Sequence, residues 1–146
     1  MPIKSFRGKL TDGEMRTIIL HTNTGTTGYR IKKFQVMTAD NVGSIENSSL
    51  LAIFKIPQAT APTSVSFDDN TLLAAADYRQ HDNEAYGIAA NNIVFDNEVF
   101  NQDIYITHKD LNSGASMNYY IELEQIQLDI NQNTVATLKD IRNLKQ

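Results

Sequence analysis

The sequence predicts an all-β protein, an antiparallel β-sandwich that is jelly-roll-like. Short runs of alternating polar and apolar residues recur at spacings of about 8–15 residues, with loops rich in Asn, Gly, Pro and Ser between them. The alternation of strand and helix that is typical of α/β folds is missing. Asn and Thr are abundant, and both suit turns and strand faces better than helix interiors. We expect helix in less than about a fifth of the chain.

The chain has the size of one domain. We expect a single β-sandwich over residues 1–146, with an N-terminal arm over about residues 1–14 and a C-terminal tail over about residues 134–146. The formal net charge of −4 argues against nucleic acid as a partner, because phosphate binding needs a basic surface. The lack of Cys excludes disulfides, thiolate catalysis and Cys-based zinc sites. No signal peptide and no membrane-length apolar run is evident, so we expect no membrane partner.

The alternating runs and their loops predict the strands in order. We expect strands over residues 16–22, 29–38, 50–56, 65–67, 71–78, 93–95, 104–107 and 118–130. Residues 50–56 are apolar at nearly every position, which predicts a strand covered on both faces. Residues 71–78 contain residues that also suit a helix. We interpret them as a strand with Leu72, Ala74 and Ala76 pointing inward.

Two of these strands change the face on which their apolar residues lie. In the second strand the change falls at Lys32 and Lys33, and in the last strand it falls at Glu124 and Gln125. Because side chains alternate between the two faces of a strand, the later apolar side chains would otherwise turn to solvent. A β-bulge, which inserts one residue into a strand, returns them to the core. We therefore expect a bulge or a strong bend within one or two residues of each position.

Both ends of the chain carry apolar residues that a compact sandwich of this size does not need. Residues 134–146 repeat an apolar side chain every three residues, which predicts a short helix or arm segment. A helix this short does not hold in water alone, so its apolar side packs on the sandwich or on another chain. The candidate interface residues are Ile3, Phe6, Leu10, Val135, Leu138, Ile141 and Leu144.

Residues 92–108 place three carboxylates and a histidine close together in the sequence: Asp96, Glu98, Asp103 and His108. Adjacent residues of a strand face opposite ways, so these side chains do not converge readily on one point. Asp and Asn at such places bond their own backbone and shape turns. We interpret the stretch as two strands joined by a corner, with a metal site and a catalytic site as weaker alternatives.

Residues 129–140 resemble part of a calcium loop. Its positions 1, 3, 5 and 12 carry Asp129, Asn131, Asn133 and Asp140. Position 6, which needs Gly for its sharp turn, is Thr134, and a strand rather than a helix leads into the segment. We therefore expect no metal here.

Catalytic motifs are also missing from the sequence. The chain has no nucleophile elbow, no P-loop and no dinucleotide-binding glycine pattern. His21, His81 and His108 are far apart, so they form no ligand pair. Glu122 and Glu124 share one strand face, where paired carboxylates could act on a sugar, but an exposed strand face is the commoner reason for such a pair. We expect no enzyme activity and no cofactor.

Four stretches carry a resemblance to a known group of proteins: residues 2–10, 71–76, 95–108 and 118–143. They resemble small virion-associated proteins encoded by tailed bacteriophages of marine bacteria. The similarity extends over nearly the whole chain and is strongest in its last third. The resemblance implies a structural protein of the virion, made in the cytoplasm of the host bacterium, and it carries over no catalytic residue.

Two functions fit this resemblance. The first is a capsid decoration or cement protein on the head shell, bound to the major capsid protein or another virion protein. The alternative is a tail-associated or host-surface module that binds a glycan or a receptor. The number of copies in the particle distinguishes them, because a decoration protein is present in many copies and a tail part in few. Since closed symmetric oligomers are the default for soluble assemblies, we expect a homo-oligomer, with a trimer favoured.

Overall fold

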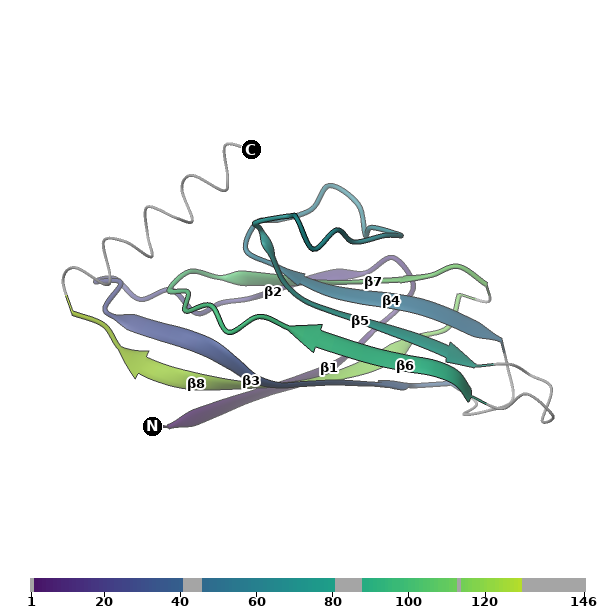
Figure 1. Cartoon of the computed structure of the whole chain (residues 1–146), viewed down its shortest axis with the longest axis horizontal. Coiled ribbons are helices and arrows are strands. Elements are labelled where there is room, and N and C mark those ends of the chain that lie inside the picture. Colours follow the sequence, from purple (N-terminus) through teal and green to yellow (C-terminus); the bar gives the residue numbers. More distant parts are fainter. Residues whose placement is uncertain (1, 41–45, 81–87, 113, 130–146) are drawn as a thin grey trace.

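The computed structural model describes residues 2–40, 46–80, 88–112 and 114–129. These residues contain eight strands and no helix, and 58% of them lie in strands. The strands form two antiparallel sheets that pack on each other (Figure 1). The predicted all-β sandwich is therefore confirmed.

The strands divide unequally between the two sheets. They are β1 (Ile3–Leu10), β2 (Met15–Ile18), β3 (Thr27–Thr38), β4 (Asn47–Phe54), β5 (Leu72–Gln80), β6 (Ile88–Phe95), β7 (Ile104–Asp110) and β8 (Met117–Gln127). The three-stranded sheet has the order β1-β8-β3, and the five-stranded sheet has the order β2-β7-β4-β5-β6. Residues 65–67, which we expected as a strand, belong instead to the connection between β4 and β5.

The pairing of strands is nested, so that the first strand meets the last. β1 pairs with β8, β2 with β7, and β4 with β5. These are three of the four pairs of an eight-stranded jelly roll. The fourth pair would join β3 to β6, but β6 pairs with β5. The jelly-roll form therefore stays a prediction, while the sandwich does not depend on it.

The residues expected as an N-terminal arm form β1, an edge strand of the three-stranded sheet. All eight of its residues pair with β8 in continuous register, from Ile3 opposite Glu124 to Leu10 opposite Met117. Most of its side chains are exposed, so its apolar alternation is weak. This weakness explains why the sequence pattern indicated an arm.

β3 carries the predicted bulge at Lys32. Its register with β8 shifts between Ile31 and Lys33, so Lys32 is the extra residue. Ile31 and Phe34 on either side are both buried, with 1% and 2% of their surface exposed. The bulge therefore keeps the apolar side chains of both halves of β3 in the core, as the change of phase indicated.

β8 has no bulge of its own at Glu124 and Gln125, where both residues pair with β3 in unbroken register. The register shift of this ladder lies opposite Leu123 and Glu122, and its extra residue is Lys32 of β3. A strong bend of β8 at this place stays a prediction. The apolar residues that follow do change face, as the sequence indicates, but no bulge returns them to the core. Leu128 packs instead over Gly28 of β3, where a Cβ atom would lie 3.0 Å from a Leu128 methyl group. The missing side chain of Gly28 thus makes room for Leu128, which is buried.

The core lies between the two sheets. Its largest fully buried side chains are Phe34, Phe100, Leu10, Ile31, Leu51, Ile53, Leu73, Ile104, Ile106, Met117, Ile121 and Leu123. Leu51 to Phe54 are all buried, as predicted for a strand covered on both faces, because the connection from β4 to β5 passes over the outside of the five-stranded sheet (Figure 1).

The inward face of β5 is predicted correctly except at its start. Ala74 and Ala76 belong to the core, but Leu73 is buried and Leu72 is only half-buried. The register of β5 with β4 shifts here, because Ile53 lies opposite Ala74 and the next residue of β4 lies opposite Leu72. This bulge places Leu73 in the core.

Deletion of Lys32 should destabilise the fold by about 3 kcal/mol or more, because it turns Phe34 and Val36 out of the core or breaks the pairing with β8. Lys32→Ala keeps the bulge and removes only an exposed side chain, so it should change stability by less than about 0.5 kcal/mol. Urea unfolding followed by circular dichroism measures both. Equal stability of the two variants would contradict the role assigned to the bulge.

Candidate binding surfaces

Residues 92–108 form two strands joined by a corner, as the sequence predicts. β6 ends at Phe95 and β7 begins at Ile104. Between them Phe100 is buried and exchanges backbone hydrogen bonds of 2.7 and 2.9 Å with Tyr29 of β3. The centroids of their two rings lie 6.4 Å apart. The corner is thus anchored to the three-stranded sheet by an aromatic contact.

The carboxylates of this corner have separate partners. Asp103 accepts hydrogen bonds from the backbone amides of Leu20 and His21 at 2.8 and 3.0 Å, and the His21 ring lies 2.7 Å away. Burial alone would raise the pKa of Asp103, but the hydrogen bonds from His21 and Leu20 together hold it below its usual value. Glu98 instead pairs with Lys55 at 2.7 Å. These contacts fix loops and do not gather the carboxylates at one point.

His108 is fully buried and engaged at both ring nitrogens. Its Nδ1 lies 3.1 Å from the carbonyl oxygens of Leu10 and Thr11, and its Nε2 lies 3.0 Å from Ser49 Oγ. The Ser49 hydroxyl also lies within hydrogen-bond distance of the Asn47 side chain. A contact between Ser and His is part of many nucleophilic sites. Both side chains are enclosed in the core here, so we interpret this cluster as a link between β4, β7 and the turn after β1.

The residues considered for a metal site are dispersed. Of the calcium-loop residues, Asp129 is described, while Asn131, Asn133 and Asp140 lie outside the described residues, as does His81. Within the described ranges, no three or more Asp, Glu or His side chains lie close enough together to hold a metal ion. The geometry therefore supplies no positive support for metal chemistry in this part of the chain.

The candidate interface residues of the two termini fall in different environments. Ile3 is 50% exposed on an open sheet edge, and Phe6 is half-buried against the core. Leu10 is completely buried, so it belongs to the core of its own chain and is not accessible to a partner. The four C-terminal candidates, Val135, Leu138, Ile141 and Leu144, lie outside the described residues.

An apolar surface that the sequence did not indicate lies where β6 ends. Phe67, Val94 and Phe95 are 73%, 51% and 40% exposed, and they line one hollow of about 290 Å³ with the half-buried Leu72. We call these four residues the Phe67 patch. β6 is an edge strand, so the patch adjoins a row of backbone groups that no strand of the described chain covers.

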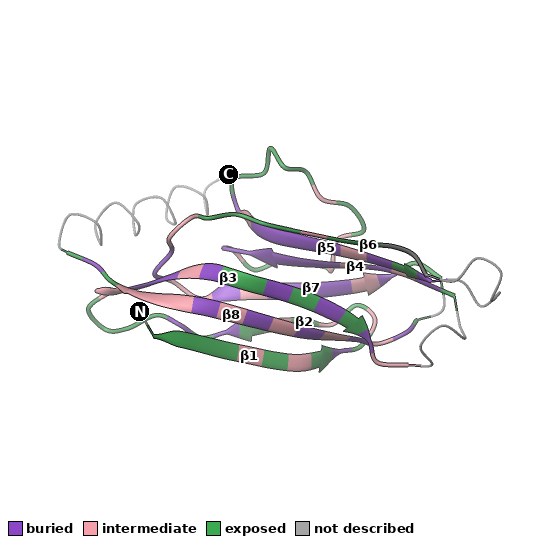
Figure 2. Cartoon of the chain, turned by 60° about the horizontal axis from the view of Figure 1, so that its bottom comes forward, coloured by how far each residue is buried: buried purple, intermediate pink, exposed green. Residues whose placement is uncertain are grey.

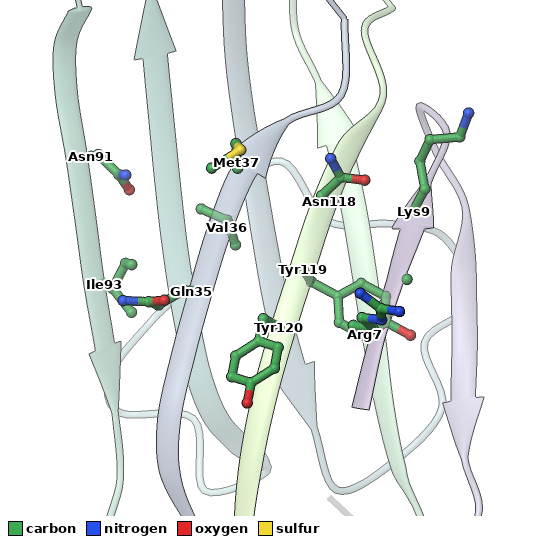
Figure 3. Close-up of a pocket in the computed structure, with 11 residues that line it drawn as sticks. Arg7, Lys9, Gln35, Val36, Met37, Asn91, Ile93, Asn118, Tyr119 and Tyr120 are labelled. Atoms are coloured by element: carbon green, nitrogen blue, oxygen red, sulfur yellow. The ribbon is translucent and has the colours of Figure 1, made fainter. Parts of the chain in front are cut away.

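A polar surface lies on the side of the three-stranded sheet that faces away from the core. Figure 2 shows buried and exposed residues alternating along β3, as expected when one face packs inward and the other meets water. We call the solvent side of this sheet the outer face. A hollow of about 760 Å³ extends from this face past the edge of β3 to β6, and it is lined by Arg7, Gly8, Lys9, Gln35, Val36, Met37, Asn91, Ile93, Asn118, Tyr119 and Tyr120 (Figure 3).

The register of the sheet builds two rows of side chains in this hollow. One row joins Arg7 to Tyr120 to Gln35, and the next joins Lys9 to Asn118 to Met37. Residues that lie directly opposite each other in neighbouring strands point to the same face. The hollow also reaches β6, because β6 lies near β3 without pairing to it.

Neither surface is predictable from the local sequence pattern. That pattern places Arg7 and Lys9 in an N-terminal arm and not in a sheet. The alternation in the last strand did indicate that Asn118, Tyr120 and Glu122 share a polar face. Their neighbours on β1 and β3 follow only from the register.

Comparisons with known proteins identify no family. No protein-family model and no curated protein matches the chain. Of the residues that the structure describes, none belongs to a helix long and apolar enough to cross a membrane.

Stability should fall as the pH drops below about 6.5. Burial lowers the pKa of His108 below its usual 6.5, although the carbonyls of Thr11 and Leu10 oppose this. The folded chain therefore keeps His108 neutral at a pH where the unfolded chain binds a proton, so its contribution to stability is complete above pH 6.5 and is lost below it. Glu14 and Asp103 have lowered pKa values and titrate at a lower pH.

Urea-unfolding midpoints at pH 7.5 and 5.5 test this dependence. His108→Gln should reduce the difference between the two midpoints, although it lowers both. Ser49→Ala removes a partner of the ring and keeps the titrating group, so the pH difference should persist. An unchanged pH difference in His108→Gln would show that another group is responsible.

Treatment with a chelator of divalent cations should leave the melting temperature unchanged. A specific ion present at a hundred times its dissociation constant adds about 2.7 kcal/mol, which corresponds to roughly 5 °C or more for a domain of this size. Differential scanning calorimetry with and without EDTA measures the shift. A drop of that size would revive residues 129–140 as a calcium site.

Proposed function

We propose that the protein is a structural component of a bacteriophage virion, a decoration protein that binds the head shell as a homo-oligomer, with a trimer favoured. The resemblance of residues 2–10, 71–76, 95–108 and 118–143 to virion-associated phage proteins supports the class. The β-sandwich with three nested strand pairs is compatible with it. The main structural support for a role in assembly is the Phe67 patch beside the open edge of β6.

The Phe67 patch is an unusual feature for a protein that works alone. Soluble monomers rarely expose contiguous apolar side chains, and they usually protect their edge strands with charges, bulges or covering loops. Ile19 and Leu111 are also exposed, at 71% and 58%, but neither shares a hollow with Phe67. Phe67 and Val94 offer apolar area on the outer side of the five-stranded sheet, and Phe95, the next residue of β6, points to the opposite side beside the same open strand edge. A neighbouring subunit or the major capsid protein would cover both.

A second candidate function is a tail-associated or host-surface module that binds a glycan or a receptor. The polar hollow on the outer face favours it, because binding sites for small ligands are concave and combine apolar surface with a few placed polar groups. Copy number separates the two functions. Quantitative mass spectrometry of purified particles should find many copies per virion for the decoration protein, and a few copies would favour the second candidate.

Replacement of apolar side chains in the patch should weaken binding to head shells. The double variant Val94→Asp, Phe95→Ser adds a charge and removes a ring on surface that is exposed in the single chain, so it should fold. We expect it to lose at least about tenfold in co-sedimentation with purified heads of the parent phage, since burying an unpaired charge costs several kcal/mol. Ile19→Asp, at an isolated exposed position, is the matched control and should bind like the unmodified protein.

Circular dichroism verifies that each variant keeps its β-rich spectrum, and sedimentation velocity reports the oligomer size. Normal head binding and normal oligomer size of the double variant would contradict the assembly role of the patch. Failure of the unmodified protein to bind heads and to form oligomers would contradict the proposed function itself.

A further inference from the structure

Charge is distributed unevenly over the molecule. The whole chain has 13 Lys and Arg residues against 17 Asp and Glu residues. The outer face of the three-stranded sheet has the opposite balance, because five cations meet two carboxylates there. The cations are Arg7, Lys9, Arg30, Lys32 and Lys33, and the carboxylates are Glu122 and Glu124. An acidic protein thus presents a locally basic face.

Both carboxylates of the outer face already have partners. Glu124 pairs with Arg30 at 2.6 Å and lies 3.8 Å from Lys32. Glu122 accepts a hydrogen bond of 2.7 Å from the hydroxyl of Tyr120. Glu124 is thus paired with cations at the end of the face away from the hollow, whereas Glu122 lies beside the hollow, bonded to the lining residue Tyr120.

Arg7 and Lys9, which line the hollow, are left without a carboxylate. Both are exposed, and within the described ranges neither side chain forms an ion pair. They lie two residues apart on β1, so both point to the outer face. Two cations that no carboxylate neutralises attract a negatively charged ligand.

The other groups of the hollow are suited to hydroxyl-bearing ligands. The ring of Tyr120 lies between Arg7 and Gln35 in one row, and Asn118 lies beside Lys9 in the next (Figure 3). The side-chain amides of Gln35 and Asn118 form no hydrogen bond with the described residues, so their donors and acceptors are open to a ligand. Lys33 Nζ lies 5.9 Å from the centroid of the Tyr120 ring, which steadies that ring.

The dimensions and composition of the hollow distinguish between classes of acidic ligand. Three strands at about 4.8 Å spacing and two rows about 7 Å apart make a platform of roughly 10 by 7 Å. A stable protein partner needs an interface of about 1,000 Å² or more, which is much larger than this. Single-stranded nucleic acid needs successive aromatic side chains for its bases, and Tyr120 is the one aromatic side chain of these two rows. A short sugar segment fits in both size and chemistry.

We propose that the outer face of the three-stranded sheet binds an acidic oligosaccharide. The apolar face of a sugar ring stacks on Tyr120, and its hydroxyl groups bond the amides of Gln35 and Asn118. Its carboxylate or sulfate groups pair with Arg7 and Lys9, and the guanidinium of Arg7 offers two parallel donors to such a group. This inference does not depend on where the protein sits in a particle.

Titration calorimetry on the full-length protein tests the inference with defined probes. The acidic probes are hexasaccharides of alginate, of heparin and of polysialic acid, and the comparison probes are cellohexaose, sodium sulfate and a single-stranded DNA decamer. We expect at least one acidic hexasaccharide to bind more tightly than cellohexaose, sulfate and the DNA, with an affinity that falls as salt rises. Arg7→Gln and Tyr120→Ala should each weaken this binding about tenfold.

Arg79→Gln is the matched control, because Arg79 is an exposed cation on the other sheet. It should leave binding unchanged. Arg7→Gln and Arg79→Gln should keep the unfolding midpoint of the unmodified protein, and Tyr120→Ala, which loses the contacts of its ring with Glu122 and Lys33, should keep the β-rich circular dichroism spectrum. The inference is overturned if no acidic hexasaccharide binds, if sulfate or the DNA binds as tightly, or if Arg7→Gln and Tyr120→Ala bind like Arg79→Gln. These measurements do not involve head binding, so they can contradict the oligosaccharide inference without contradicting the decoration role.

Discussion

The extra residue at Lys32 is the constraint on which the three-stranded sheet depends. β3 is twelve residues long and contributes buried side chains from both of its halves, although its apolar pattern changes phase in the middle. A strand cannot do this while it stays in simple register, because each step of one residue turns the side chain to the opposite face. The bulge adds one residue at Lys32, so the apolar side chains before and after it face the same side of the sheet. It also places Lys32 and Lys33 together on the exposed side, so the same residue that completes the core adds to the basic character of the outer face.

Elements that bury an apolar face were predictable from the sequence, and elements at the margins were not. β3, β4 and β8 have strong apolar patterns, and their positions and faces follow from those patterns. β1 lies at an edge, and most of its side chains are exposed. Its apolar alternation is therefore too weak to indicate that it pairs with another strand. The apolar residues after Glu124 do change face, and Leu128 is buried because it packs over Gly28, which is distant in the sequence. The periodicity of a single segment cannot predict a contact with a distant one.

The two candidate surfaces depend on which strands pair and in which register, and the sequence of a single strand does not determine either. The rows of the outer face exist because β1 and β3 flank β8 in one particular register. The hollow reaches Asn91 and Ile93 because β6 joins β5 and leaves β3 with an open edge. The same choice leaves the outer edge of β6 free beside Phe95. One departure from a regular jelly-roll pairing therefore accounts for the positions of both surfaces, and each surface combines residues that are far apart in the chain.

The nested pairing also determines how the chain can fold while it is being made. β1 and β2 leave the ribosome before their partners β8 and β7, with β3, β4, β5 and β6 synthesised between them. The apolar side chains of β1, including Leu10, therefore stay unpaired until β8 has been made. Contacts this distant in sequence form slowly, and unpaired strands are the segments that aggregate. The sparse, largely polar character of β1, which made it look like an arm, therefore keeps the waiting N-terminal segment soluble until the strand that completes its sheet arrives.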